Sequence, residues 1–234
     1  MALTYVDAHD SGRIHFLMVQ PDSPRGHMTG RYEEKRDFRK TPEPKAGGKT
    51  AAKEGRLPRF VVQEHRATSH HFDFRLEIGG ALVSWAVPKG PSTDPAEKRL
   101  AIRTEDHPLD YAEFEGVIPK GQYGAGTVLI WDRGSFENIT EQDDDAGAQQ
   151  ALPAALKEGH LLVRLKGEKL QGGYALQRIE EAEKQGDQEQ WLLIKTKDEE
   201  ADARRNPVST EPRSVASGRT LREVSKEEKQ EGKS

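Results

Sequence analysis

Three polar residues at alternate positions, His71, Asp73 and Arg75, have the types and spacing that best support chemistry in this chain. Side chains two residues apart on a β-strand share one face, so these three lie together. The phenylalanines between them, Phe72 and Phe74, take the opposite face. Histidine and aspartate bind divalent metals, and the arginine fork binds phosphate or carboxylate. The alternation predicts a strand with a hydrophobic core on one face and a metal-and-anion site on the other.

His65 extends this set to two histidines and one carboxylate. It precedes His71 by six residues, and Gln63 shares its face by the same alternation. If residues 66–70 form a turn, His65 returns beside His71 and Asp73. This donor set is typical of Mn, Fe or Zn sites that keep positions open for substrate. A surface strand that carries only a His–Asp–Arg ladder is the alternative left open by these residues.

Other motifs could complete a phosphate site. A histidine such as His107 can act as a general acid, and the hydroxyl of Tyr111 can donate to developing phosphate charge. Lys89, in a rigid Pro-Lys-Gly-Pro turn, and Arg99 could add phosphate contacts. The glycine-rich loop 115–126 lacks the ending of a P-loop and is expected to be an irregular connection that shapes the site. Taken alone, the motif around His107 and the Pro-Lys-Gly-Pro turn are more typical of ordinary surface turns.

Eight short segments rich in β-branched and aromatic residues are predicted to be the strands that position these side chains. They span residues 60–65, 71–78, 81–87, 99–104, 126–133, 160–165, 173–179 and 190–196. Gly79-Gly80 is a two-residue hairpin signal. Eight strands separated by turns favour a small barrel or a sandwich. A short helix is expected within 148–158, and a second near Leu221–Lys229.

The chain is predicted to divide into four parts: a disordered extension (1–30), a basic arm (31–58), a β domain (59–197) and a disordered polar tail (198–234). Residues 31–59 contain ten Lys/Arg and five Asp/Glu, whereas residues 135–190 contain six and twelve. An arm of this charge suits a phosphate backbone, although a solvated linker would have a similar composition.

The composition limits the cellular setting. Only 33% of residues are hydrophobic and 32% are charged, so long unpacked segments are expected. The absence of cysteine excludes disulfides and thiolate metal sites and is compatible with a reducing cytoplasm. No apolar run approaches the roughly 20 residues that span a membrane. The first residues also lack a secretory signal pattern. We therefore expect a cytoplasmic protein without a membrane partner, associated with the nucleoid if the basic arm binds DNA.

Six runs, which follow one another over about 75 residues, carry a resemblance to a known family. They are QEHRATSHHFDFRLE, SWAVPKGP, KRLAI, EDHPLDYAEFEG, IPKGQYGAG and WDRG. Together they closely resemble the 3′-phosphoesterase domain of bacterial DNA ligase D, here as a free-standing protein, from about Tyr32 to Lys195. The resemblance implies a small closed β-barrel, mainly β, with its active site on the outer surface. It also implies Mn²⁺-dependent removal of a 3′-terminal ribonucleoside from DNA, followed by removal of the 3′-phosphate; other divalent transition metals would suit the same ligands.

The resemblance also assigns roles to residues. Three match the family's metal ligands: His65, His71 and Asp73. Three match residues that contact the scissile phosphate: Arg75, His107 and Tyr111. Four match supporting positions: Gln63, Lys89, Arg99 and Glu105. Three match residues near the part of the site that handles the ribonucleoside: Arg36, Asp37 and Glu43. The expected reaction is metal-assisted phosphoester hydrolysis, with His107 as the candidate acid for the leaving oxygen.

The expected partners are a DNA primer–template or a DNA 3′ end that carries a ribonucleotide or a 3′-phosphate. A separate repair ligase, polymerase and end-binding proteins would complete end joining, and the protein is expected to be a monomer. Two other functions stay open. A non-haem Fe(II) oxygenase would use His71, Asp73 and a distal histidine as a facial triad, and turnover of 2-oxoglutarate would reveal it. A non-catalytic DNA-end-binding module would need no such set of catalytic side chains.

Overall fold

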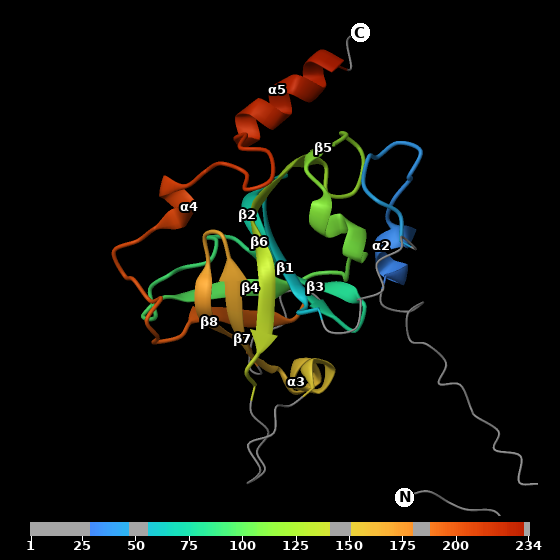
Figure 1. Ribbon diagram of the computed structural model, residues 1–234. Coiled ribbons are helices and arrows are strands. Elements are labelled where there is room, and N and C mark those ends of the chain that lie inside the picture. Colours follow the sequence, from blue (N-terminus) through green and yellow to red (C-terminus); the bar gives the residue numbers. More distant parts are fainter. Residues whose placement is uncertain (1–28, 47–55, 141–150, 180–187, 232–234) are drawn as a thin grey trace, which may run out of the picture.

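The computed structural model describes residues 29–46, 56–140, 151–179 and 188–231, and these form a closed antiparallel β-barrel (Figure 1). The strands are β1 (Arg59–Arg66), β2 (His70–Ile78), β3 (Ala81–Val87), β4 (Lys98–Arg103), β5 (Gly116–Ile118), β6 (Gly126–Asn138), β7 (His160–Gly167), β8 (Gln171–Arg178) and β9 (Gln190–Lys195). The ring runs β1-β2-β3-β4-β9-β8-β7-β6, and pairing of β6 with β1 closes it. β5 adds to β6 outside the ring. All eight predicted strands are present. β5 was not predicted, because its three residues are too few to show an alternating pattern.

The barrel interior takes one face of each strand. Phe72, Phe74 and Leu76 of β2 are almost fully buried in the same cluster as the barrel tryptophans. Phe72 packs edge-on against Trp131, with 5.3 Å between ring centroids, and Phe74 stacks on Phe60. The predicted apolar face of β2 is therefore confirmed as the core face.

A second hydrophobic cluster covers part of the outer surface. It joins Val61 of β1 and Leu82 of β3 to Tyr111 of the short 3₁₀ helix η1 (Leu109–Glu113) and to Tyr32 of α2 (Gly30–Glu34). Tyr32 is buried, and its hydroxyl donates to the carbonyl of Pro44 at 2.7 Å. The first half of the predicted basic arm, which contains α2, is thus packed on the outside of the barrel (Figure 1).

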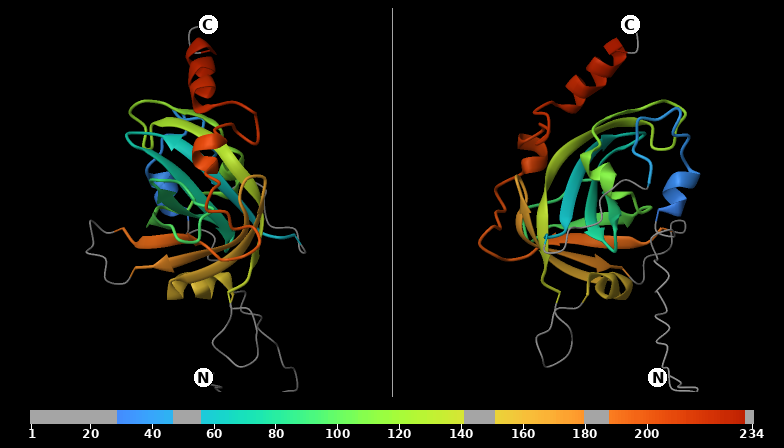
Figure 2. Two further views of the ribbon diagram at one scale, coloured as in Figure 1. Left: turned by 90° about the vertical axis from the view of Figure 1, so that its left-hand side faces the viewer. Right: turned by 45° about the vertical axis from the view of Figure 1, so that its right-hand side comes forward.

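The described part of the segment predicted to be a disordered polar tail packs on the barrel. It contains α4 (Pro207–Thr210) and α5 (Leu221–Glu231), and α5 confirms the helix expected near its end. The Trp131 indole donates to the carbonyl of Glu211 at 2.9 Å, and the Lys169 ammonium donates to the carbonyls of Glu211 and Arg213. Leu221 and Val224, in the first turn of α5, are buried in the core cluster, and the helix projects from the barrel (Figure 2). Backbone carbonyls and a few isolated apolar side chains hold this segment, so its sequence shows no periodic apolar pattern.

The remaining helix, α3 (Leu152–Glu158), falls within the predicted range 148–158 and begins with a proline in its first turn. It packs beside β7 at one end of the barrel (Figure 1). Within the described residues, no helix has both the length and the apolar character needed to cross a membrane. Residues 1–28, which include most of the predicted N-terminal extension, lie outside the described residues.

Candidate metal and phosphate site

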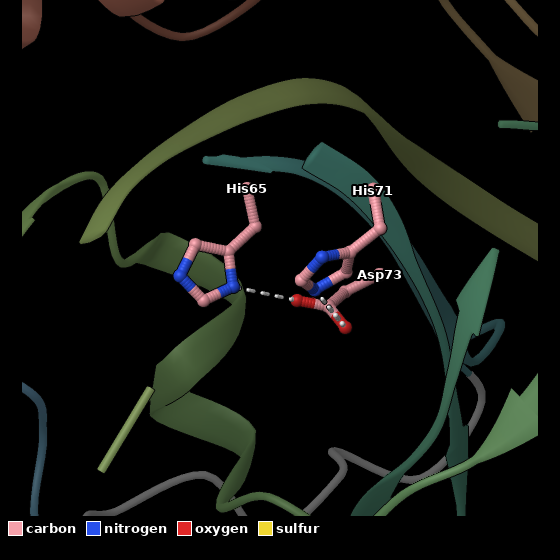
Figure 3. Close-up of side chains that lie close together, drawn as sticks. All are labelled: His65, His71 and Asp73. Carbon is pink, nitrogen blue, oxygen red and sulfur yellow. Dashed lines mark ion pairs between the residues drawn. The ribbon is translucent and has the colours of Figure 1, made fainter. Parts of the chain in front are cut away.

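The β1–β2 hairpin brings two histidines and one aspartate together. His65 and His71 are directly opposite in the antiparallel register, and Asp73 follows His71 by two residues on the same face. Figure 3 shows the three side chains converging. His65 Nδ1 lies 3.6 Å from one carboxylate oxygen of Asp73, and His71 Nε2 lies 3.7 Å from the other. One candidate ligand atom from each residue lies within 4.8 Å of the others. The spacing therefore predicted this convergence correctly.

Backbone carbonyls orient both imidazoles. His65 Nε2 lies 3.0 Å from the carbonyl oxygen of Gly124, and His71 Nδ1 lies 3.2 Å from that of Ser69. Each carbonyl accepts a ring proton, so the lone pair of the other nitrogen is directed toward Asp73. Metal-binding histidines are commonly held in this way. The three residues therefore fit a divalent transition metal, with a donor set shared by Mn²⁺, Fe²⁺ and Zn²⁺.

The electrostatic environment favours the metal-binding protonation states. Burial alone would raise the pKa of Asp73, but the Arg75 guanidinium and the two imidazoles hold it well below its ordinary value. Burial lowers the pKa of His71, an effect that the nearby Asp73 carboxylate only partly offsets. An ionised carboxylate and an uncharged imidazole are the forms that bind a metal cation. Little proton release is therefore needed from these two groups near neutral pH.

Arg75 is a buried and rigidly held cation between the three candidate ligands and His107. Its Nε donates to Gln63 Oε1 at 2.8 Å, and its Nη1 donates to Ser84 Oγ at 2.8 Å. Nη1 also lies 2.9 Å from His107 Nδ1, while Nη2 lies 3.1 Å from Asp73 Oδ2. A guanidinium fixed in this way needs little reorganisation to stabilise a phosphoryl group.

His107 is buried and uncharged. Its backbone forms an isolated antiparallel bridge with Leu82, which brings the loop after β4 against β3. Burial, reinforced by the cations Arg75 and Arg36, lowers the pKa of its imidazole well below the ordinary value. Nδ1 is shared between the Arg75 guanidinium and the carbonyl of Glu105, each at 2.9 Å. While Nδ1 accepts from Arg75, the single ring proton resides on Nε2, which is then a hydrogen-bond donor.

Tyr111 lies against His107, with 4.6 Å between ring centroids, and its ring faces the Arg75 guanidinium at 5.0 Å. Burial raises the pKa of its phenol well above the ordinary value, so the hydroxyl keeps its proton. The Gln63 amide fixes the backbone here, because its Nε2 donates to the carbonyls of Tyr111 and Phe114 at 3.1 and 2.8 Å. Gln63 is fully buried and lies beneath these groups.

The arm contributes a buried cluster of charges. Arg36 donates from Nε to Glu43 at 2.9 Å and from Nη1 to Glu105 at 2.8 Å, with all three side chains almost fully buried. Because Glu105 lies two residues before His107, the cluster adjoins the phosphate-binding candidates. Asp37 instead pairs with Arg39 at the surface.

Lys89 and Arg99 lie apart from this constellation. Lys89 is exposed in the turn after β3, and Arg99 of β4 pairs with Glu97. Arg99 is opposite Leu193, a core residue of β9. Within the described ranges, neither cation forms a hydrogen bond or ion pair with the three candidate ligands or with His107. Their supporting roles stay predictions.

Sequence reasoning missed four neighbours of the site: Tyr32, Lys35, Ser84 and Tyr123. Ser84 is opposite Arg75 in the β2–β3 register, so the Gly79-Gly80 hairpin signal could have identified it. Tyr32 and Lys35 come from the arm, where no periodic signal was available. Tyr123 lies in the loop expected to shape the site, and the carbonyl of the next residue, Gly124, orients His65.

Comparisons with known proteins associate this chain with one family. Residues 63–178 match the family model of the DNA ligase D 3′-phosphoesterase domain. The chain is 49% identical over 200 residues to the multifunctional non-homologous end joining protein LigD of Pseudomonas aeruginosa, covering 85% of this chain and 22% of that protein. It is 44% identical over 160 residues to the multifunctional non-homologous end joining DNA repair protein LigD of Mycobacterium tuberculosis, covering 68% and 19%. The chain thus spans about a fifth of the length of these relatives.

Proposed function

The chain belongs to the DNA ligase D 3′-phosphoesterase family, a group of DNA end-processing domains, and we propose that it heals DNA 3′ ends in a metal-dependent reaction. In this proposal it removes a 3′-terminal ribonucleoside and then the 3′-phosphate, leaving a 3′-hydroxyl for repair synthesis and ligation. The observation that carries the proposal is the convergence of His65, His71 and Asp73 beside the buried Arg75–His107 pair.

Each part of this constellation has a chemical task. A divalent metal, proposed to be Mn²⁺, held by the two histidines and Asp73 would polarise a phosphoryl oxygen. Arg75 supplies fixed positive charge for the transition state, and its bonds to Gln63 and Ser84 keep it aligned. Tyr111, as a protonated phenol, donates a hydrogen bond to a phosphoryl oxygen.

His107 is assigned a different role from the one expected from sequence. Burial and two neighbouring cations hold the pKa of its imidazole far below neutrality, so the imidazolium is scarce in the resting protein. We therefore assign it as a neutral donor through Nε2–H to the phosphate, in place of the acid that protonates the leaving oxygen. Because the Arg75 guanidinium can only donate, its contact with Nδ1 supports this tautomer, in which Nδ1 does not donate to the Glu105 carbonyl.

The geometry favours a phosphoesterase over the two alternatives. An oxygenase triad of His71, Asp73 and a distal histidine would need His107 beside Asp73, yet the partners of His107 Nδ1 are Arg75 and the carbonyl of Glu105. A module that only binds DNA ends gains nothing from two imidazoles oriented by carbonyls toward one carboxylate. A separate ligase, polymerase and end-binding proteins are proposed to act with this domain.

The decisive experiment uses 5′-labelled primer–templates that end in one ribonucleotide or in a 3′-phosphate. With Mn²⁺, the first should be shortened to a 3′-phosphate and then to a 3′-hydroxyl end, and chelation should stop both steps. His71→Ala should abolish product, whereas His160→Ala should not, because His160 is exposed at the start of β7. Unchanged 3′ ends with Mn²⁺ and with other divalent metals would overturn the proposal, and 2-oxoglutarate turnover would favour the oxygenase.

A further inference from the structure

Tyr123 presents an exposed aromatic ring at the edge of the site. The exposed large hydrophobic residues within the described part of the chain are Leu57, Leu100 and Tyr123, and Tyr123 is 49% exposed. It lies one residue before Gly124, whose carbonyl orients the candidate ligand His65. An aromatic ring left open to solvent beside a candidate catalytic centre suggests a contact made only when substrate is present.

Two cations from the arm hold this ring in place. Lys35 Nζ lies 4.4 Å from the ring centroid and donates to the Tyr123 hydroxyl at 3.2 Å. The Arg36 guanidinium lies 5.5 Å from the same centroid. Both cations also pair with Glu105. The ring is therefore attached to the buried charge cluster that reaches His107, while about half of its surface stays available.

The ring also borders open space. Tyr123, Lys35 and Glu105 belong to the lining of a groove with a volume of about 1150 Å³. The rest of the lining comes from α2, α3, the end of β4 with the loop after it, the end of β8 and the two residues before β9. A flat group bound in the groove could lie against the Tyr123 ring.

We propose that Tyr123 stacks on the nucleobase of the 3′-terminal nucleoside that the domain removes, an inference that rests on the proposed function. A scissile phosphate bound by Arg75 and His107 has one nucleoside on either side in that substrate. The groove that Tyr123 lines has room for a nucleoside, so we place the terminal one on this side. Aromatic stacking accepts every base because each base has a π-face, so it suits an enzyme that must act on ends of any sequence. Tyr123 thus favours substrates that end in a nucleoside, whichever base that nucleoside carries.

The test compares three primer–templates: one with a terminal ribonucleoside, one with a terminal abasic ribose and one with a 3′-phosphate. Tyr123→Ala should lower kcat/KM for the ribonucleoside end by roughly 5- to 150-fold, the range given by typical base–aromatic stacking. Release of the 3′-phosphate should change far less, because no nucleoside lies beyond that phosphate. The wild type should lose a similar factor when the terminal base is removed, and Tyr123→Ala should lose little more. Tyr123→Phe should lose much less than Tyr123→Ala because it keeps the aromatic face, and the neighbouring Gln122→Ala should behave as the wild type.

A binding measurement separates this inference from the proposed function. The fluorescence of Tyr123→Trp, measured with EDTA so that no turnover occurs, should be quenched more by the ribonucleoside end than by the abasic end. That difference supports stacking even if the wild type released no product, a result that would overturn only the proposed function. Equal quenching by the two ends would overturn stacking. Equal losses of both reactions in Tyr123→Ala would also overturn it, because they would show that the ring merely supports the loop that orients His65.

Discussion

Replacement of Gln63 by alanine tests whether a buried amide holds the phosphate-binding residues in place. Gln63 is fully buried and links three groups: its oxygen accepts from Arg75, and its nitrogen donates to the carbonyls of Tyr111 and Phe114. Alanine would leave one charged donor and two carbonyls without these partners. Family resemblance places Gln63 among the supporting residues, and its contacts suggest that it supports the site from below.

The expected loss of stability follows from these bonds. A hydrogen bond to a charged group contributes about 1.5–3 kcal/mol and a neutral one about 1 kcal/mol, so Gln63→Ala should destabilise the fold by about 4 kcal/mol. This is a large share of the roughly 5–15 kcal/mol that stabilises a typical domain. With a urea m-value of about 2 kcal/mol/M, the unfolding midpoint should fall by about 2 M.

Urea unfolding, followed by tryptophan fluorescence, measures this change. Gln177→Ala is a matched control, because Gln177 is exposed on β8, and it should shift stability by less than about 0.5 kcal/mol. Release of 3′-phosphate by folded Gln63→Ala should also fall, because Arg75 loses one of the bonds that align it. A variant that keeps its midpoint but loses activity would refute this reasoning and indicate direct contact between Gln63 and substrate.

Three further predictions concern the barrel. Phe74→Ala should cost about 3–5 kcal/mol in urea unfolding, because the ring is completely buried, and a cost below 1 kcal/mol would contradict its place in the core. Burial raises the pKa of Asp132 to about 6, above its unfolded value of about 4, so this group's contribution to stability should be lost as pH rises from about 4 to 6. The stability difference between the wild type and Asp132→Asn should therefore change by about 3 kcal/mol over that interval, and an unchanged difference would exclude the shift. Deletion of residues 207–234 should lower Tm, because backbone carbonyls of that segment accept hydrogen bonds from a buried indole and a largely buried ammonium, and an unchanged Tm would show that the segment adds no stability.

The parts of the site that could be predicted from sequence are those set by local geometry. Strand alternation places His71, Asp73 and Arg75 on one face because the side-chain period of a β-strand is two. A hairpin turn then places His65 opposite His71. Both inferences require only neighbouring residues, so tertiary packing had little opportunity to alter them.

What could not be predicted depends on contacts between distant segments. The alternation suggested that the Arg75 face is open, yet Arg75 is buried, because η1 and the arm fold over the outer surface. The arm has the composition of a linker, and nothing in its local pattern indicates that Tyr32 will pack against Tyr111, about 80 residues later. Arg75→Ala would consequently leave Asp73 without its cation, so this substitution should affect folding as well as catalysis.

The charges around the site show how the burial of Arg75 under η1 and the arm can favour binding of a metal and a phosphate. Arg36, Arg75 and the partly exposed Lys35 balance the carboxylates of Asp73, Glu43 and Glu105, since each cation lies within ion-pairing distance of at least one of them. The protein groups alone are therefore close to neutral. A divalent cation would add positive charge in a setting that screens charges poorly, and a phosphate would add the compensating negative charge. Metal and phosphate should each favour binding of the other, and a burial that would be costly for either alone becomes tolerable for the pair.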